Sequence, residues 1–246
     1  MTGLGVLAAA LHVPGTDDAV PVAEAKKVLG RKGLLGKEPS TLLALCAVHR
    51  MFGLPPGRPA EQVCADTAVL VASNLGNVAT VCAIVDTVRA EGTKGVSPMD
   101  APNASSNVIA STIAIWYGLT GPNIAVCSGA TAGLDAVRLA SLLLRSGRAA
   151  RALVVGVEPA DDIATGIAGQ LVEGAASVLL GLEDGPGPRL GPVRQVADID
   201  TADEFTGMYG ASGVARVAAA CAAGVSATVG CGDAVDGYLA VDVSHG

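Results

Sequence analysis

The residues best placed to do chemistry stand in the turn CSGATAG, residues 127–133, which joins an apolar run to a long helical pattern. A thiol or hydroxyl group at the start of a buried helix can act as a nucleophile, because unpaired N–H groups and the helix dipole favour its anionic form. The segment GATAG also imitates the G-x-S-x-G elbow of hydrolases. One hypothesis is therefore a stand-alone acyltransferase or hydrolase that uses Cys127 or Ser128.

That hypothesis requires a histidine as general base. The chain has three histidines, His12, His49 and His245, and only His245 follows the turn. Cys127 also ends an apolar run, where we expect burial to raise its pKa and to block access to its thiol. The sequence therefore favours a structural role for Cys127 over a nucleophilic one.

Other function classes are disfavoured by composition. None of the six cysteines forms a C-x-x-C pair or stands at metal-ligand spacing from a histidine, so we expect neither a metal site nor a cofactor. The net charge of −7, without a basic stripe, argues against nucleic acid and anionic membranes as partners. No apolar run reaches spanning length and no basic segment precedes the first one, so we expect a cytoplasmic protein.

Apolar runs of strand length alternate with helical patterns along the chain, which is typical of a layered α/β protein. The stretch GPGPRLGP, 185–192, has the composition of a linker. After a first strand and loop within 1–14, we predict strands at 66–73, 124–128, 151–158, 174–183 and 237–243. We predict helices at 40–53, 76–92 and 104–117, then a long one ending near Gly147 and one within 210–224.

Several of these segments, in this order, resemble the β-ketoacyl synthase family. The matching pieces are ASNLGN, VSPMDAPNASSN, IAIWYGLTGPN, CSGATAG, GLDAVRLASLLLRSGRA, ALVVGVE, VEGAASVLL and GASG. The resemblance implies a thiolase-like layered αβαβα fold with a strongly reduced C-terminal half. It also implies that 1–246 is a single domain, in which 1–185 is the N-terminal ketosynthase-like half and 186–246 the truncated remainder.

In that family the turn before the long helix carries the catalytic cysteine, and the resemblance places Ala130 at this position. A methyl group cannot form a thioester. The family also uses two histidines, but the residues before GASG are Thr206, Gly207 and Met208, and the segment that would carry the other histidine is missing. The resemblance therefore implies that the chain has no catalytic residue of its own.

The chain is most similar to the chain length factors of type II polyketide systems, which lack the cysteine and share GLDA after it; they usually carry glutamine where this chain has Ala130. Carried over from them, the residues that cap the partner's acyl tunnel are Val78, Val81 and Val85. Small side chains there imply a deep tunnel for a linear or polyene chain. A helical core stripe explains the three valines equally well.

The resemblance also implies a heterodimer with an active β-ketoacyl synthase, which would meet an acyl carrier protein carrying the growing chain. The family dimerises through the strand before the nucleophile turn, here Ile124, Ala125, Val126, Cys127 and Ser128. A loop with Asp100, Ser105 and Ser106 resembles a further dimer contact, although a polar turn and a helix cap explain it equally. A homodimeric scaffold without a bound chain is a third hypothesis.

Overall fold

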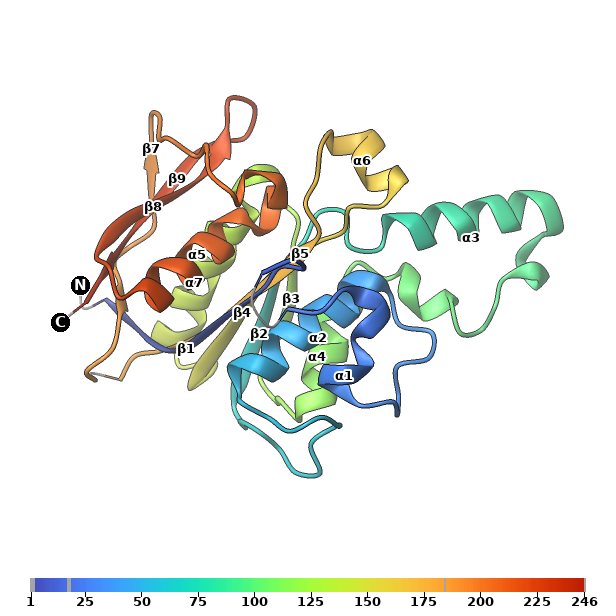
Figure 1. Ribbon diagram of the computed structural model, residues 1–246, viewed down its shortest axis with the longest axis horizontal. Helices are drawn as coiled ribbons and strands as arrows, with labels where there is room; N and C mark the ends of the chain where they lie inside the picture. Colours follow the sequence, from blue (N-terminus) through green and yellow to red (C-terminus); the bar gives the residue numbers. More distant parts are fainter. Residues whose placement is uncertain (1–2, 17–18, 184, 246) are drawn as a thin grey trace.

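The computed structural model describes residues 3–16, 19–183 and 185–245, and its framework is one strongly curled sheet (Figure 1). The strands are hydrogen-bonded in the order β3-β2-β4-β5-β1-β6-β9-β7, and β8 pairs with β9 beside this path. In chain order they are β1 (Leu4–His12), β2 (Thr67–Ala72), β3 (Asn123–Val126), β4 (Arg151–Glu158), β5 (Gly174–Gly181), β6 (Arg189–Leu190), β7 (Arg194–Val196), β8 (Ala227–Asp233) and β9 (Gly237–Ser244).

The centre of the sheet is buried on both faces, which explains its sequence of small and β-branched residues. Every residue of β2 and of β5 is buried, and so are seven of the eight residues of β4. Strands β3, β2 and β4 are parallel, whereas β5 is antiparallel to both β4 and β1. Continuous apolar strands of this kind require helices on both sides of the sheet.

Helices occupy two layers. The α-helices are α1 (Lys26–Leu29), α2 (Pro39–Met51), α3 (Val78–Glu91), α4 (Val108–Tyr117), α5 (Ala132–Arg145), α6 (Asp162–Ala168) and α7 (Ser212–Ala223). Helices α2 and α4 build one apolar cluster against the sheet, and α5 and α7 build a second cluster on its other face. The second cluster continues into β8 and β9, so α5 and α7 lie between two parts of the curled sheet (Figure 1).

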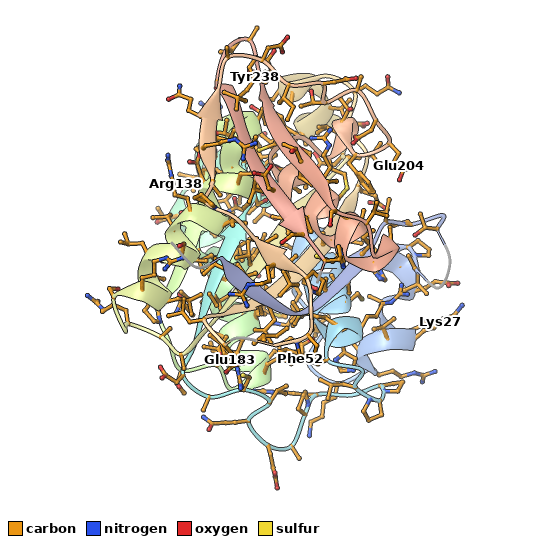
Figure 2. The ribbon with its side chains drawn as sticks, turned by 90° about the vertical axis from the view of Figure 1, so that its left-hand side faces the viewer. Lys27, Phe52, Arg138, Glu183, Glu204 and Tyr238 are labelled. Atoms are coloured by element: carbon orange, nitrogen blue, oxygen red, sulfur yellow. The ribbon has the colours of Figure 1, made fainter. Side chains whose placement is uncertain are left out.

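The layers therefore follow the order helix, sheet, helix, sheet, and the last sheet layer contains β8 and β9 from the C-terminal part of the chain. Figure 2 looks onto this last layer, with Tyr238 of β9 at the top and Arg138 of α5 at the left. Within the described residues, α7 is the only α-helix after β5. The division of 1–246 at residues 185 and 186 stays a prediction.

Most of the predicted elements are confirmed, and β4 has its predicted bounds, whereas β3 ends at Val126, two residues before the end predicted for it. The linker interpretation of 185–192 is wrong, because β6 lies inside this stretch and pairs with both β1 and β9. Glycine and proline indicated a flexible connection, but backbone hydrogen bonds incorporate the segment into the sheet. The sequence also failed to indicate β7 and β8, which are short or poor in large apolar residues.

Helix α3 projects from the body of the molecule (Figure 1). None of its fourteen residues, all of which the structure describes, is buried. The core-stripe interpretation of Val78, Val81 and Val85 is therefore wrong for this chain, because no core exists around the helix. Across the residues the structure describes, no helix is long and apolar enough to cross a membrane.

Candidate functional site

The turn between β3 and α5 places Ala130 at the head of the long helix. A short 3-10 turn, Gly129–Thr131, leads directly into α5, and Gly129 has a φ of 66°, in the left-handed region that favours glycine. Ala130 is 7% exposed. Ala130 is therefore a nearly buried residue directly before the start of α5.

The backbone N–H of Ala130 is already bound. It donates a hydrogen bond of 2.7 Å to Oδ2 of Asp236, in the turn between β8 and β9. The backbone N–H of Asp236 in turn donates to Oδ1 of Asp233 at 2.7 Å. A donor that could stabilise an oxyanion in this fold is thus paired with a carboxylate of the same chain.

Glu158, the last residue of β4, is the buried acid of the site. Its carboxylate accepts hydrogen bonds from the backbone N–H groups of Asn74 and Leu75, at 2.8 and 3.0 Å, and from the side chain of Ser73. Burial raises the pKa of Glu158 to about 7, although these hydrogen bonds act in the opposite direction. The carboxylate ties the end of β2 to the end of β4.

Asn74 connects this acid to the turn. Its amide donates from Nδ2 to the Gly129 carbonyl at 3.0 Å and to Glu158 at 3.1 Å, and its Oδ1 accepts from the Gly129 N–H at 3.0 Å. Gly210 lies against this network, because a Cβ there would stand 2.1 Å from Asn74 Nδ2. Sequence analysis matched ASNLGN and GASG to a family but assigned no role to Asn74, Glu158 or Gly210.

Tyr209 stands beside the same network in a strained backbone conformation. Its φ of 44° and ψ of −117° are unusual for a residue with a side chain. Burial raises the pKa of its phenol, and the carboxylates of Asp236, Asp233 and Glu158 raise it further. Three carboxylates therefore surround the turn, and no sequence motif indicated their convergence.

The predicted burial of Cys127 is wrong, because β3 ends at Val126 and Cys127 is exposed just beyond it. Its thiol donates to the Ser73 carbonyl at 3.1 Å. Partial burial raises the pKa of this thiol, and Glu158 raises it further, so the thiol form is favoured at neutral pH. The adjoining cavity is small, with a volume of about 40 Å³.

Ser128 donates its hydroxyl to a carboxylate rather than to a histidine. Its Oγ donates to Asp135 at 2.6 Å, and Thr131 donates to the same carboxylate at 2.8 Å. Arg138 also pairs with Asp135, at 2.6 Å. The acceptor is thus a carboxylate that Thr131 and Arg138 already share, and not the imidazole that activates the serine of a hydrolase triad.

The histidines have other partners. His12 is fully buried at the end of β1, where its Nε2 bonds to the Val20 carbonyl at 3.0 Å. His49 is buried in α2 between the Pro55 carbonyl and the hydroxyl of Tyr117. His245 follows β9, and its backbone N–H bonds to Ser226. Among the described interactions, none of the three imidazoles contacts the turn 127–135.

The predicted tunnel residues lie on α3, with Val78 and Val81 half-buried and Val85 40% exposed. Helix α6 packs beside α3 and adds Ile167, which is 62% exposed. Together the apolar residues of α3 and α6 form a surface that we call the α3–α6 face: Val78, Val81, Val85, Val88, Ile163 and Ile167. On α3 the four valines recur at positions i, i+3, i+7 and i+10, so they lie along one side of the helix.

The predicted dimer residues fall in two places. Asp100, Ser105 and Ser106 are exposed in the segment before α4. Asn77, which precedes α3, donates to the Asn103 and Ser105 carbonyls at 2.9 and 3.1 Å, so this segment is fastened to the base of α3.

Strand β3 supplies the other place. It lies at one end of the sheet order and pairs with β2; within the described part of the chain it has no second strand neighbour. Ile124 and Ala125 are half-buried, Val126 is buried, and Ser128 is exposed with Cys127. An unpaired edge of this kind offers backbone N–H and C=O groups to another strand.

Known proteins with similar sequences belong to one family. The N-terminal domain of the β-ketoacyl synthases matches residues 37–170, more than half of the chain. A 3-oxoacyl-[acyl-carrier-protein] synthase 2 of Vibrio harveyi is 31% identical over 126 residues, covering 51% of this chain and 29% of that protein. A Vibrio cholerae protein of the same description is also 31% identical. The chain thus matches under a third of the length of these curated relatives.

Solved structures match along almost the whole chain. A structure described as the ishigamide ketosynthase/chain length factor has a TM-score of 0.70 at 20% identity and covers 98% of both chains. The ketosynthase ApeO in complex with its chain length factor ApeC, from Xenorhabdus doucetiae, gives 0.68 at 13% identity, with 100% of both chains covered. At these identities the likeness shows the fold, and it confirms the predicted thiolase-like architecture. Because the family match spans more than half of its residues, this chain belongs to the β-ketoacyl synthase family.

Proposed function

We propose that the chain is a non-catalytic chain length factor, which pairs with an active β-ketoacyl synthase and shapes its acyl tunnel in type II polyketide biosynthesis. The observation that carries this proposal is Ala130 at the head of α5, where its N–H is bound by Asp236. Neither a nucleophile nor a histidine base is found there among the described residues. The growing acyl chain would then stay on the partner and on an acyl carrier protein that meets the complex.

Structural neighbours support this kind of role. Two of them are titled as ketosynthases with chain length factors, and a third is titled as a type II polyketide acyl-carrier protein in complex with its ketosynthase. The third has a TM-score of 0.73 at 14% identity and covers 100% of both chains. Those titles describe the neighbours, and the same assembly for this chain is our proposal.

Two surfaces support a partner of the same fold. The β3 edge would continue its sheet across a twofold axis by pairing with the equivalent strand of the ketosynthase. The α3–α6 face would be covered in the same assembly, because an isolated helix gains most of its stability from packing an apolar face. In the free chain that stabilisation is missing, since no residue of α3 is buried.

Val78, Val81 and Val85 would close the far end of the partner's tunnel. Valine side chains leave more space than aromatic ones, so we propose a long linear or polyene product rather than a folded aromatic one. We also propose the cytoplasm as the location, because all six cysteines are free thiols, which suits a reducing compartment.

Co-expression with an intact ketosynthase of the same host tests the assembly. We expect a one-to-one heterodimer by size-exclusion chromatography with light scattering, and a monomeric chain without the partner. A stable homodimer that ignores the ketosynthase would instead support the homodimeric scaffold.

The variant Val81→Phe tests the tunnel. The heterodimer carrying it should release a shorter product than the wild-type complex, as measured by mass spectrometry, because the phenyl ring fills the end of the tunnel. Ala83→Phe is the matched control, since two helical residues differ by about 200° in direction. An unchanged product from an intact Val81→Phe complex would contradict the capping role.

The exposure of Cys127 favours one second candidate, a stand-alone acyltransferase or hydrolase that uses Cys127 or Ser128. The raised pKa of this thiol and the pairing of Ser128 with Asp135 oppose it. Incubation of the isolated chain with an acyl thioester distinguishes the two candidates. Turnover that is lost in Cys127→Ala or Ser128→Ala would replace our proposal.

A further inference from the structure

We propose that Asp236 is an internal ligand that occupies the oxyanion-binding position of this fold, so that the turn is closed to acyl thioesters by a carboxylate as well as by the missing sulfur. This inference deepens the proposed function and depends on it only in taking Ala130 as the nucleophile position. In this proposal, the β8–β9 hairpin prevents acyl thioesters from binding at the turn of Ala130.

The first support is the hydrogen bond itself. At 2.7 Å, the contact between Ala130 N and Asp236 Oδ2 has the length of a charge-assisted bond. An oxyanion that forms during acyl transfer would need this same N–H. A thioester carbonyl could reach it only by displacing the carboxylate, which is covalently part of the chain and therefore always at hand.

The second support is the close approach of Asp236 to the turn. A Cβ added at Gly129 would stand 2.0 Å from Asp236 Oδ2, so the absence of a side chain at Gly129 creates the space that the carboxylate fills. Asp236 is itself exposed and Ala130 is buried, so the carboxylate lies between solvent and the helix start. A substrate that approached the turn from this side would have to pass the negative charge of Asp236.

The third support is the way the hairpin holds Asp236 in place. Asp233 Oδ1 accepts from the N–H groups of Val235 and Asp236, at 2.8 and 2.7 Å, which fixes the loop on its own acid. In β8, Cys231 is fully buried and contacts the Thr131 carbonyl, so the hairpin is anchored against the turn on its inner side too. The β8–β9 hairpin therefore holds the Asp236 carboxylate at a fixed position beside the turn.

The charge at this position has a chemical consequence for any nucleophile placed there. A helix start stabilises a thiolate through its unpaired N–H groups and its positive dipole. Here a carboxylate has taken the N–H and adds a negative charge beside the Cα atom of residue 130. A thiol introduced at this point should therefore stay protonated and unreactive, and an anionic thioester would be repelled.

The test restores the sulfur and then removes the carboxylate. Ala130→Cys is compared with Ala130→Cys/Asp236→Ala and Ala130→Cys/Asp236→Asn, all in a Cys127→Ser background, using the isolated chain without any ketosynthase. Alkylation by iodoacetamide at pH 7 is followed by peptide-resolved mass spectrometry. We expect the thiol at position 130 to react at least about tenfold faster in both double variants, because a drop of one unit in its pKa gives ten times more thiolate.

Cys231 serves as the internal control for opening of the hairpin, since it is fully buried in β8, the strand that leads into the turn with Asp236. Its alkylation should stay slow in every variant. Equal rates at position 130 with and without Asp236 would overturn the proposal, and so would an acceleration at Cys231 that matches the one at position 130 in both double variants. Because no partner is used, the outcome is separate from that of the heterodimer experiment.

Discussion

The turn at Ala130 and the projecting helix α3 differ in how far their groups are satisfied by contacts within the chain. At the turn, the polar groups that could act on a substrate are paired within the chain: the Ala130 N–H with Asp236, Gly129 with Asn74, and Asn74 with Glu158. Along α3, none of the residues is buried and the apolar side chains face outward. The turn is thus closed by hydrogen bonds within the chain, whereas the apolar side chains of α3 are left without a buried environment.

This contrast agrees with a division of labour between two subunits of one fold. A catalytic turn has to keep its donors free for the transition state, which costs stability until the substrate arrives. A subunit that leaves chemistry to its partner can use the same donors to hold its own hairpins. Its remaining unsatisfied surface is then the one that the partner covers.

The largest effect should follow from a charge introduced on the α3–α6 face, and it should be seen in the affinity for the ketosynthase. Val85→Asp is expected to weaken binding of the ketosynthase about 100-fold, which corresponds to about 3 kcal/mol, because the carboxylate would be desolvated in the interface. The melting temperature of the free chain should hardly change, since Val85 is already 40% exposed. Calorimetric titration of the separated subunits, or a pull-down at several concentrations, measures the loss.

Val225→Asp is the matched control, because Val225 is 55% exposed in the connection between α7 and β8, which belongs neither to the α3–α6 face nor to the β3 edge. It should leave the affinity unchanged. Similar losses from both variants would break the contrast, since α3 would then be no more of a binding surface than the rest of the molecule.

A smaller effect should come from Glu158, the buried acid beside the turn at Ala130. Its titration should make the free energy of unfolding depend on pH. Burial raises the pKa of Glu158 from its ordinary value of 4.5 to about 7 in the folded chain. The folded state therefore binds more protons between pH 4.5 and 7, and the free energy of unfolding falls as the pH rises through this window. Between pH 5 and 7 the loss should be about 2 kcal/mol.

Glu158→Gln removes the titration and should flatten this slope, although it also weakens the fold at every pH because an amide replaces one of the two acceptors. Urea unfolding at pH 5, 6 and 7 compares the two proteins. Parallel slopes for the wild type and the variant would show that Glu158 is ionised throughout this range.

The smallest effect should come from the hairpin contact. Asp236→Ala is expected to lower the free energy of unfolding by about 1 kcal/mol, because the Ala130 N–H loses its acceptor at a position that solvent can partly reach. Chemical denaturation measures this change. A gain in stability would mean that repulsion among Asp236, Asp233 and Glu158 outweighs the hydrogen bond, and that the turn is strained rather than satisfied.

Local patterns were sufficient for most of the framework. The strands β2, β4 and β5 are continuous apolar runs, and the turn before α5 follows from CSGATAG and the helical pattern behind it. Patterns failed where the environment decides the outcome. Cys127 lies in an apolar run, yet the strand ends one residue earlier and leaves it exposed; the valines of α3 have core spacing, yet no core surrounds them.

What the sequence by itself determined is the identity of the side chains at one turn: a methyl group at position 130, and no histidine in the contexts that its family uses. The contacts that close this turn were decided by tertiary structure alone. They join residues that are far apart in the chain and that meet where β2, β4 and the β8–β9 hairpin end together: Asn74, Glu158, Tyr209 and Asp236. Hydrogen bonds between such residues depend on strand order and on the curl of the sheet, and no local periodicity encodes either of them.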